Sequence, residues 1–335
     1  MSLPATAQDR DVALVQRLGD LIHEIPSSVE IIPGGMDDWS LTPEFPVLYT
    51  EGNIGMPHKV LLRLYLCALS PFNLLRPNLR TNLWSDEQSK MLLNSSAILL
   101  HANPAHQTAL NARKCFIQSG KLSAQQELGF TRNLLCSSHE CAKQSIIWAH
   151  RQWLLRRHYA CDGTTGNVTE DGCNIPAEVL QNELDLVKRC SKSYPRNYHA
   201  WTHWQFCVEM AYHQELYSFL TDVYLQLEKW IEQNVSDYSA IHHFGKMTKK
   251  LQVISFRKPG TLQVDVTPYA CLNRATAFLS RYPEHESLWM YLRVVCDSPY
   301  GLDPDWRDSV EETIRSLPDN MHRRRCVSWL SRTFQ

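Results

Sequence analysis

Residues 194–204 read Tyr-Pro-Arg-Asn-Tyr-His-Ala-Trp-Thr-His-Trp, and this eleven-residue pattern recurs four more times along the chain. The other copies begin at Asn103, Cys141, Asn234 and Tyr282. A large apolar residue fills the eighth position of every copy: Leu110, Trp148, Trp201, Ile241 and Trp289. Their spacings of 38, 53, 40 and 48 residues each accommodate two helices and two turns. The pattern therefore predicts an all-α solenoid built from helical hairpins.

Helix signals surround the copies. Apolar residues spaced for one helical face precede the fourth copy, at Leu216, Leu220, Val223, Leu227 and Trp230. Residues 85–88 and 123–126 match the capping box that opens a helix, a serine followed three residues later by glutamine. Proline in the second position of three copies suits the turn before a new helix. Each copy is thus expected to open the second helix of a hairpin.

The organisation predicted from these signals has three parts. Residues 1–80 contain an N-terminal helix (about 7 to 24), a linker rich in Pro and Gly at 33–57, and leading helices. Residues 81–296 hold the five repeats, and residues 297–335 hold capping helices. Exposed loops are expected at 158–176 and 256–268, and no period-two alternation predicts a sheet.

Composition excludes several classes of function. The formal net charge of −1 gives no bulk attraction to nucleic acid or to an anionic membrane. No apolar stretch approaches the roughly 20 residues that span a bilayer. Eleven cysteines without a C-x-x-C motif are expected to be reduced thiols, which favours a cytoplasmic protein. The adjacent His242 and His243 point in different directions on a helix, so no metal site is expected in this chain.

Chemistry-bearing motifs are missing as well. The chain has no Gly-rich phosphate loop, zinc-protease helix or nucleophile elbow. Two classes of function remain open. The chain is either a helical-repeat scaffold or adaptor, or one subunit of a heteromeric enzyme whose reactive centre lies on the partner.

The pattern [Asn/Tyr]-Pro-x-x-Tyr-x-x-Trp-x-x-Arg resembles the repeat of protein prenyltransferase alpha subunits, and its five copies cover residues 103 to 292. Residues 24–69 and 95–113 are similar to one branch of that family, the alpha subunit of the type 3 geranylgeranyltransferase. The resemblance implies a right-handed α-α superhelix wrapped around a beta subunit. Tetratricopeptide repeats keep a 34-residue period, which this chain does not.

The resemblance also implies a division of labour. The beta subunit carries the zinc and the isoprenoid pocket, and zinc holds the acceptor cysteine as a nucleophilic thiolate. The implied partner is the Rab geranylgeranyltransferase beta subunit. The implied substrates are geranylgeranyl diphosphate and proteins with C-terminal cysteines, such as a farnesylated SNARE or an F-box protein. A role in Rab GTPase prenylation is an alternative.

The resemblance implies site residues at those positions of this chain that match functional positions of the family's repeat. The family places a lysine five residues before the second-repeat tryptophan, directed at the isoprenoid diphosphate, and Lys143 fills that position here. Lys143 is the expected catalytic residue, although Ser145 replaces a tyrosine common in the family. Asn197, Tyr198 and His199 match positions that line the same interface. The competing interpretations are a solvated lysine for Lys143 and core packing for Tyr198.

Other positions are expected to be structural. The arginine that closes the pattern is present as Arg113 and Arg151, where it would bind carbonyls or a carboxylate between hairpins. Trp204, Phe244 and Leu292 replace it in the last three copies. The later repeats should therefore be more apolar and pack differently, which keeps the scaffold alternative open.

Overall fold

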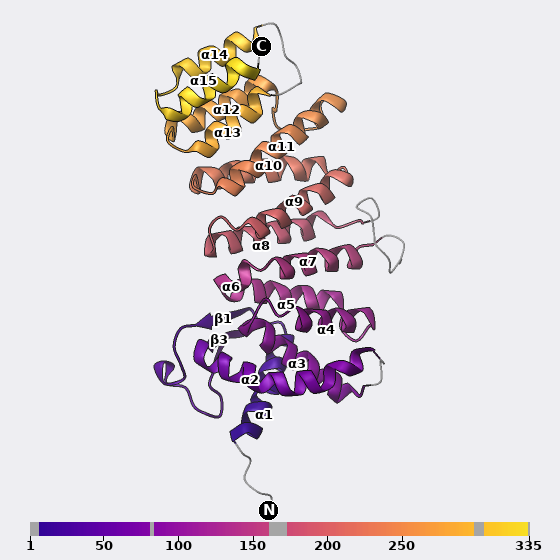
Figure 1. Ribbon diagram of the computed structural model, residues 1–335. Coiled ribbons are helices and arrows are strands. Elements are labelled where there is room, and N and C mark those ends of the chain that lie inside the picture. The colour runs from indigo at the N-terminus through magenta and orange to yellow at the C-terminus, as the bar shows by residue number, and fades with distance from the viewer. Residues whose placement is uncertain (1–6, 81–83, 161–172, 298–304, 334–335) are drawn as a thin grey trace, which may run out of the picture. The chain divides into compact units, whose positions relative to one another are not determined.

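The structure is a computed structural model that describes residues 7–80, 84–160, 173–297 and 305–333. Helices dominate these ranges and follow one another as antiparallel hairpins (Figure 1). The all-α repeat fold predicted from the sequence is confirmed. None of the helices in the described ranges is long and apolar enough to cross a membrane.

The five copies of the pattern each form a hairpin. The first helices are α3 (Asp86–Ala102), α5 (Ala124–Ser137), α8 (Ala177–Ser193), α10 (Tyr217–Gln233) and α12 (Pro268–Arg281). The second helices are α4 (Gln107–Gln118), α7 (Ser145–His158), α9 (Tyr198–His213), α11 (Tyr238–Arg257) and α13 (Glu286–Cys296). A short helix, α6 (His139–Ala142), precedes α7, and α14 (Trp306–Ser316) and α15 (Met321–Thr333) follow the repeats.

Local sequence explains where these helices begin. Both predicted capping boxes are present. The Ser85 and Ser123 side chains each accept a hydrogen bond from the backbone N–H three residues on, and the glutamine side chain at that position accepts one from the serine backbone N–H. The fourth position of the pattern caps the second helix in several repeats. The His106 side chain accepts from Ala109 N, and Asp237 accepts from Ala240 N. The pattern thus encodes a turn and a helix start together.

The N-terminal part differs from the expectation of a helix and a loop. Between α1 (Ala7–His23) and α2 (His58–Leu75) the chain forms three short strands, β1 (Ser28–Ile32), β2 (Leu48–Thr50) and β3 (Asn53–Pro57), and one 3₁₀ turn, η1 (Asp37–Trp39). A second 3₁₀ turn, η2 (Arg76–Arg80), follows α2. The sheet order is β1-β3-β2, with β1 parallel and β2 antiparallel to β3. The expectation of no sheet was wrong because strands of three to five residues are too short to show alternation.

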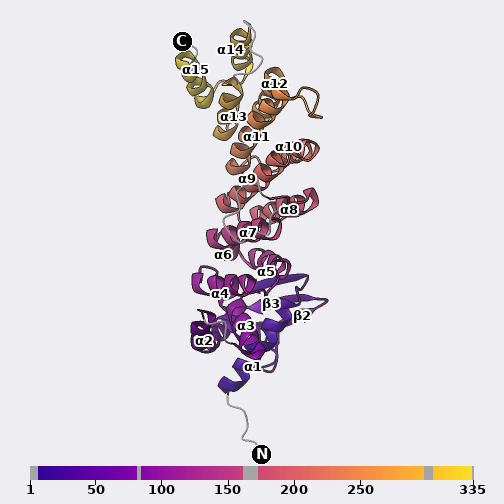
Figure 2. The ribbon, with the colours of Figure 1, turned by 90° about the vertical axis from the view of Figure 1, so that its right-hand side faces the viewer.

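The small sheet is anchored on the second repeat, since β1 packs against α5. Figure 2 shows the sheet, labelled at β2 and β3, beside α5. Asn133 on α5 donates to the Pro26 carbonyl oxygen at 2.8 Å. A Cβ on Gly129 would lie 2.8 Å from Ile25 Cδ1, so a larger residue there would have to push the Ile25 side chain aside. The sheet is therefore an addition to the repeat fold.

The chain divides into two compact units. The first comprises residues 1–175 and 182–203, and the second comprises residues 176–181 and 204–335. The boundaries expected from the sequence, at 80 and 296, separate the repeats from the segments before and after them. They address a different division from that into compact units, and they stay a prediction. The loop expected at 256–268 is present between α11 and α12. Most of the one expected at 158–176 lies outside the described residues.

The eighth position of the pattern is buried in all five repeats, at Leu110, Trp148, Trp201, Ile241 and Trp289. Two of its tryptophans, Trp148 and Trp289, also close the turn of their own repeat. Trp148 Nε1 donates to the Ala142 carbonyl oxygen at 2.8 Å, and Trp289 Nε1 donates to the Pro283 carbonyl oxygen at 2.7 Å. Both carbonyls belong to the second position of the pattern. The indole therefore buries apolar surface in the core and, through its N–H group, donates a hydrogen bond that fixes the turn.

Trp148→Phe should lower the free energy of unfolding by about 1–3 kcal/mol, because it leaves the buried Ala142 carbonyl with one donor fewer and removes part of a packed side chain. Trp39 offers a matched control: it is exposed, and its Nε1 also donates to a backbone carbonyl oxygen, that of Pro33, at 2.7 Å. Trp39→Phe should cost no more than about 0.5 kcal/mol. Urea denaturation of both variants measures the difference, and equal losses would contradict this role of the indole.

Candidate site at the junction of the second and third repeats

Lys143 lies at the C-terminal end of α6, immediately before α7. Its side chain is 38% exposed, and Nζ donates to Glu140 Oε1 at 2.7 Å. This hydrogen bond raises the pKa of Lys143, so the side chain is a cation at every physiological pH. The Tyr194 ring, partly exposed at the start of the third repeat, is an electrostatic neighbour of the ammonium. Lys143 is thus an accessible positive charge held on a helical turn.

The backbone beside Lys143 is fixed by the third repeat. Asn197 Nδ2 donates to the Ala142 carbonyl oxygen at 2.8 Å, the same oxygen that accepts from Trp148 Nε1. Asn197 Oδ1 accepts from Ala200 N at 3.1 Å and so caps α9. Asn197 is 1% exposed. Its amide joins the two repeats and positions Lys143, and it does not face a surface where a diphosphate could reach it.

Tyr198 and His199 lie at the start of α9. Tyr198 is 68% exposed, so core packing does not account for it. Its ring meets that of His199 edge-on, with the centroids 5.5 Å apart. The structure thus brings Lys143, Asn197 and Tyr194 together at one junction, and it leaves Tyr198 as an exposed aromatic side chain next to that junction in sequence.

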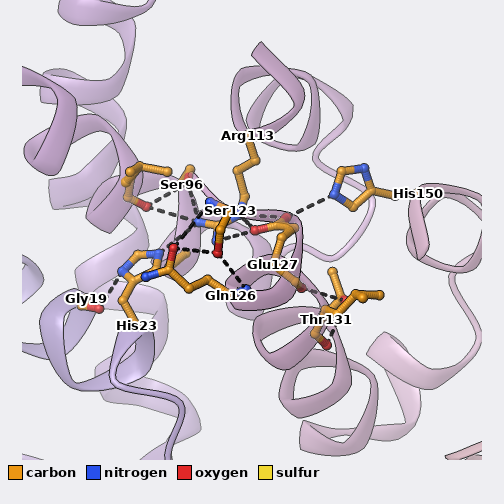
Figure 3. A network of polar contacts seen from close by, with 12 residues as sticks. Gly19, His23, Ser96, Arg113, Ser123, Gln126, Glu127, Thr131 and His150 are labelled. Atoms are coloured by element: carbon orange, nitrogen blue, oxygen red, sulfur yellow. Dashed lines mark hydrogen bonds and ion pairs between the residues drawn. The ribbon is translucent and has the colours of Figure 1, made fainter. Parts of the chain in front are cut away.

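A buried cluster of charges lies between the first and second repeats (Figure 3). Arg113 on α4 donates from Nε to Glu127 Oε1 and Oε2 at 3.0 and 2.9 Å, and from Nη2 to Oε2 at 2.6 Å. His150 on α7 places Nε2 2.9 Å from Glu127 Oε1. All three side chains have no exposed surface. One carboxylate on α5 therefore ties together α4 and α7.

The remaining donors of Arg113 reach the N-terminal helices. Nη1 lies 3.0 Å from Ser96 Oγ on α3 and 3.1 Å from His23 Nε2 on α1. The guanidinium also lies over the Phe130 ring, with its carbon 3.7 Å from the centroid. His23 Nδ1 in turn lies 2.7 Å from the Gly19 carbonyl oxygen. The guanidinium is satisfied on every side, as a buried charge requires.

A second cluster repeats this arrangement between the second and third repeats. Arg151 donates from Nε and Nη2 to Glu183 on α8 at 2.5 and 2.7 Å, and from Nη1 to the Leu128 carbonyl oxygen at 2.7 Å. His203 on α9 places Nε2 2.9 Å from Glu183 Oε2. The arginine takes the eleventh position of one copy and the histidine the tenth position of the next. The two Arg–Glu–His clusters are therefore equivalent.

Electrostatics keep each cluster in one charge state. Burial alone would raise the pKa of Glu127 and of Glu183, but the adjacent arginine and the histidine hydrogen bond outweigh it and lower both to about 2. Burial lowers the pKa of His150 and of His203, so both are neutral and donate from Nε2. Each cluster is thus one ion pair with a neutral histidine that completes the carboxylate's hydrogen bonding.

In the second unit aromatic residues take the place of arginine at the eleventh position of the pattern. Trp204 and Phe244 occupy the arginine position there, and both are buried. The Phe244 ring stacks on Tyr224 with the centroids 4.5 Å apart and lies 5.0 Å from Tyr291. His243 keeps the histidine position, and its Nδ1 lies 3.0 Å from Gln205 Oε1. The later repeats are thus more apolar at this position.

Sequence reasoning missed the acidic and histidine members of the clusters. Glu127 and Glu183 lie 14 and 32 residues after their arginines, with no fixed spacing. The histidines could have been found from the sequence, because His150, His203 and His243 all occupy the tenth position of the pattern. Among the described residues, no group of three or more His, Cys, Asp or Glu side chains is placed to hold a metal ion.

Fold and site together define a helical-repeat protein whose hairpins are joined by buried polar clusters. Residues 180–211, which span most of α8 and α9, match the family described as Protein prenyltransferase alpha subunit repeat. This match confirms the family resemblance drawn from the sequence pattern.

Curated relatives agree with this family. The chain is similar to Protein prenyltransferase alpha subunit repeat-containing protein 1 of Danio rerio, with 26% identity over 67% of this chain and 57% of the relative. It is 25% identical to Protein prenyltransferase alpha subunit repeat-containing protein 1-A of Xenopus laevis, over 78% of this chain and 68% of that relative. It is 28% identical to Protein prenyltransferase alpha subunit repeat-containing protein 1 of Homo sapiens, over 48% of this chain and 40% of that relative. The match with the zebrafish protein spans little more than half of that protein's length.

Arg113→Met should destabilise the protein by about 3–5 kcal/mol, because it leaves the buried Glu127 carboxylate without its cation. Adding Glu127→Gln removes that charge and keeps an acceptor for His150, so the double variant should recover most of the loss. Urea denaturation and a double-mutant cycle measure the coupling. The exposed pair Arg315–Glu311 is the control, and Arg315→Ala should change stability by less than about 0.5 kcal/mol. A double variant no more stable than Arg113→Met would contradict the account.

Stability should also fall in acid in two stages. Burial lowers the pKa of His23 and of His101 to about 4, so below pH 6.5 the unfolded chain binds protons that the folded chain does not. Each histidine then removes up to about 3 kcal/mol between pH 6.5 and 4. The contributions of Glu127 and Glu183 are complete above pH 4.5 and are lost only as the pH falls from there towards 2.

His101→Phe tests the first stage, since it removes one of these proton-binding groups and leaves a ring facing Phe130. Its stability measured by urea denaturation should decline less steeply between pH 6.5 and 4 than that of the wild type. His139→Gln, which changes an exposed histidine, should leave the slope unchanged. Identical slopes in all three proteins would contradict the assignment.

Proposed function

We propose that this chain is the alpha subunit of a heterodimeric protein prenyltransferase of the type 3 geranylgeranyltransferase kind, and that Lys143 stabilises the departing diphosphate. The observation that carries the proposal is the placement of Lys143. It occupies the family's lysine position, it is accessible, and the turn that bears it is fixed by the contact of Asn197 and Trp148 with the Ala142 carbonyl.

The chemistry suits a fixed ammonium. As the bond between the isoprenoid and its diphosphate breaks, negative charge gathers on the leaving diphosphate. A cation positioned beforehand lowers the free energy of that transition state more than that of the bound substrate. Zinc on the beta subunit would supply the thiolate nucleophile of the acceptor protein, and this chain would contribute charge and position.

Glu140 bears on how Lys143 would act. It holds the ammonium at 2.7 Å, but its own side chain is 67% exposed, and an exposed ion pair contributes little free energy. A diphosphate with several negative charges would compete readily for the lysine. In the free subunit Glu140 would keep the lysine side chain on its turn, ready for the substrate.

Partner and substrates belong to the same proposal. A stable heterodimer with the Rab geranylgeranyltransferase beta subunit needs on the order of 2,000 Å² or more of buried surface. Exposed aromatic side chains such as Tyr198 suit a place at its interface. A farnesylated SNARE or an F-box protein with a C-terminal cysteine would be the acceptor, and the pair would act in the cytoplasm.

A scaffold function without catalysis is the second candidate, and one observation favours it. Asn197, expected at the diphosphate, uses its amide to join two repeats, and Lys143 already has a carboxylate partner. On this alternative the repeated pattern would serve only to hold the hairpins together.

Lys143→Ala in the co-purified heterodimer should lower geranylgeranyl transfer by roughly 10- to 1,000-fold, as expected for the loss of one electrostatic contact to the transition state. Tyr198→Phe should cost less, because it removes a hydroxyl and keeps the ring. Lys249 is a matched control, since it is partly exposed and paired with Asp297 at 2.9 Å. Lys249→Ala should retain full activity.

Single-turnover transfer to a C-terminal cysteine substrate is the measurement, with heterodimer formation checked by gel filtration. Full activity of an intact Lys143→Ala heterodimer would remove the catalytic role and leave the scaffold function. An intact wild-type heterodimer without any transferase activity would overturn the enzyme proposal itself.

A further inference from the structure

A cleft of about 460 Å³ lies in the first compact unit, and the proposed transfer reaction does not use it. Its walls come from α1, from α3 and from the turn between α4 and α5 together with the first residues of α5. Lys143 follows the opposite end of α5, and a helix of 14 residues is roughly 20 Å long. The cleft is therefore separate from the candidate site.

Two lysines line this cleft. Lys90 extends from α3, and its Nζ lies 2.9 Å from Asp20 Oδ2 on α1. Lys121 lies in the turn between α4 and α5, and its Nζ donates to Ser89 Oγ on α3 at 3.0 Å. An ammonium has three N–H donors, so each lysine keeps donors that these contacts do not use. Both lysines can therefore donate to a ligand in the cleft as well.

Two carboxylates also line the cleft, but neither neutralises Lys121 strongly. Asp20 accepts from Asn94 Nδ2 at 2.9 Å in addition to its contact with Lys90. Asp86 lies 3.9 Å from Lys121 Nζ, and its side chain is fully exposed. An exposed pair at that distance contributes little free energy, so an anion with two charges would displace Asp86. Lys121 is thus the cation most open to an anionic ligand.

The rest of the cleft combines an apolar surface with one further donor. Leu93 on α3 and Leu122 before α5 supply the apolar surface. Gln126 Oε1 accepts from the Ser123 backbone and hydroxyl, which leaves the amide nitrogen of Gln126 available as a donor. Figure 3 shows Gln126 and His23, which both line the cleft, beside the buried Arg–Glu–His cluster. The cleft therefore offers N–H donors next to an apolar surface.

We propose that this cleft binds an organic phosphate, whose phosphate group meets Lys121 and Lys90 and whose apolar part contacts Leu93 and Leu122. Lysine binds phosphate as a point charge, and two lysines suit a group with two negative charges. Clefts of this size commonly hold small ligands against apolar walls, with a few polar groups that fix the orientation. A soluble metabolite and a lipid headgroup present this same chemistry.

Phenyl phosphate is the probe for the first test, because it joins a doubly charged phosphate to a compact apolar ring. Isothermal titration calorimetry with the full chain should give a Kd on the order of 0.1–1 mM, as expected for about eleven non-hydrogen atoms. Inorganic phosphate should bind at least about 5-fold more weakly, since it buries no apolar surface against the two leucines. Absence of phenyl phosphate binding, or equal binding of the two ions, would overturn the proposal.

Two substitutions should change the affinity for phenyl phosphate in opposite directions. Lys121→Ala should weaken binding by roughly 10-fold or more, because it removes a charge-assisted hydrogen bond. Asp86→Asn should strengthen binding by roughly 2- to 5-fold, because it removes the carboxylate that competes for Lys121. Lys143→Ala and Lys249→Ala are the controls and should bind like the wild type. An unchanged affinity in Lys121→Ala, or a loss of affinity in Lys143→Ala, would contradict the proposed location.

Co-sedimentation with vesicles of phosphatidylcholine and phosphatidic acid distinguishes the two sources of phosphate. If the wild type sediments with the vesicles and Lys121→Ala does not, the cleft binds a lipid headgroup. If the wild type stays in solution but binds phenyl phosphate, the ligand is a soluble metabolite. Both results support the cleft as a phosphate site, and a chain that binds neither probe rules it out. Transferase activity does not enter either readout, so the proposed function stands or falls separately.

Discussion

The structure of the first unit depends on placing a full charge in the core without leaving it unpaired. Arg113 and Arg151 are buried, and each meets a glutamate from the next repeat and a histidine that completes the carboxylate's shell. An arginine without its glutamate in such a site would destabilise the fold by several kcal/mol. The partners of each arginine come from several different helices. The hairpins can therefore pack only in the register that satisfies all of these groups together.

The two units solve the same packing problem by different chemistry. In the first unit the eleventh position of the pattern is an arginine and the join between repeats is polar and directional. In the second unit Trp204 and Phe244 fill that position, and stacked rings such as Tyr224 and Phe244 replace the ion pair. Aromatic packing tolerates small shifts better than a bidentate ion pair does. Lys143 lies in the second of the repeats that the Arg–Glu–His clusters join, where a fixed geometry matters most.

Much of the fold could be predicted because its signals are local. The apolar eighth position, the capping boxes at Ser85 and Ser123 and the proline turns all lie within a few residues of the structure they specify. The sheet could not be predicted in this way. Its strands are short, and the pairing of β1 with β3 joins segments separated by a long irregular stretch.

The candidate site, like the fold, could be predicted only where its signal is local in the sequence. The position of Lys143 follows from its spacing to Trp148, but the use of Asn197 does not, because its partner is the Ala142 carbonyl 55 residues earlier. The glutamates of the clusters likewise lie 14 and 32 residues from their arginines. Spacing within the pattern identifies which residues recur, and only the packed structure shows which of them meet.

We propose that this helical-repeat chain works as one half of a prenyltransferase. Sedimentation velocity of the purified chain mixed with the purified Rab geranylgeranyltransferase beta subunit is the decisive measurement. We expect a single 1:1 complex at micromolar concentrations, formed without any substrate. Two separately sedimenting proteins, with this beta subunit and with every other prenyltransferase beta subunit, would contradict it.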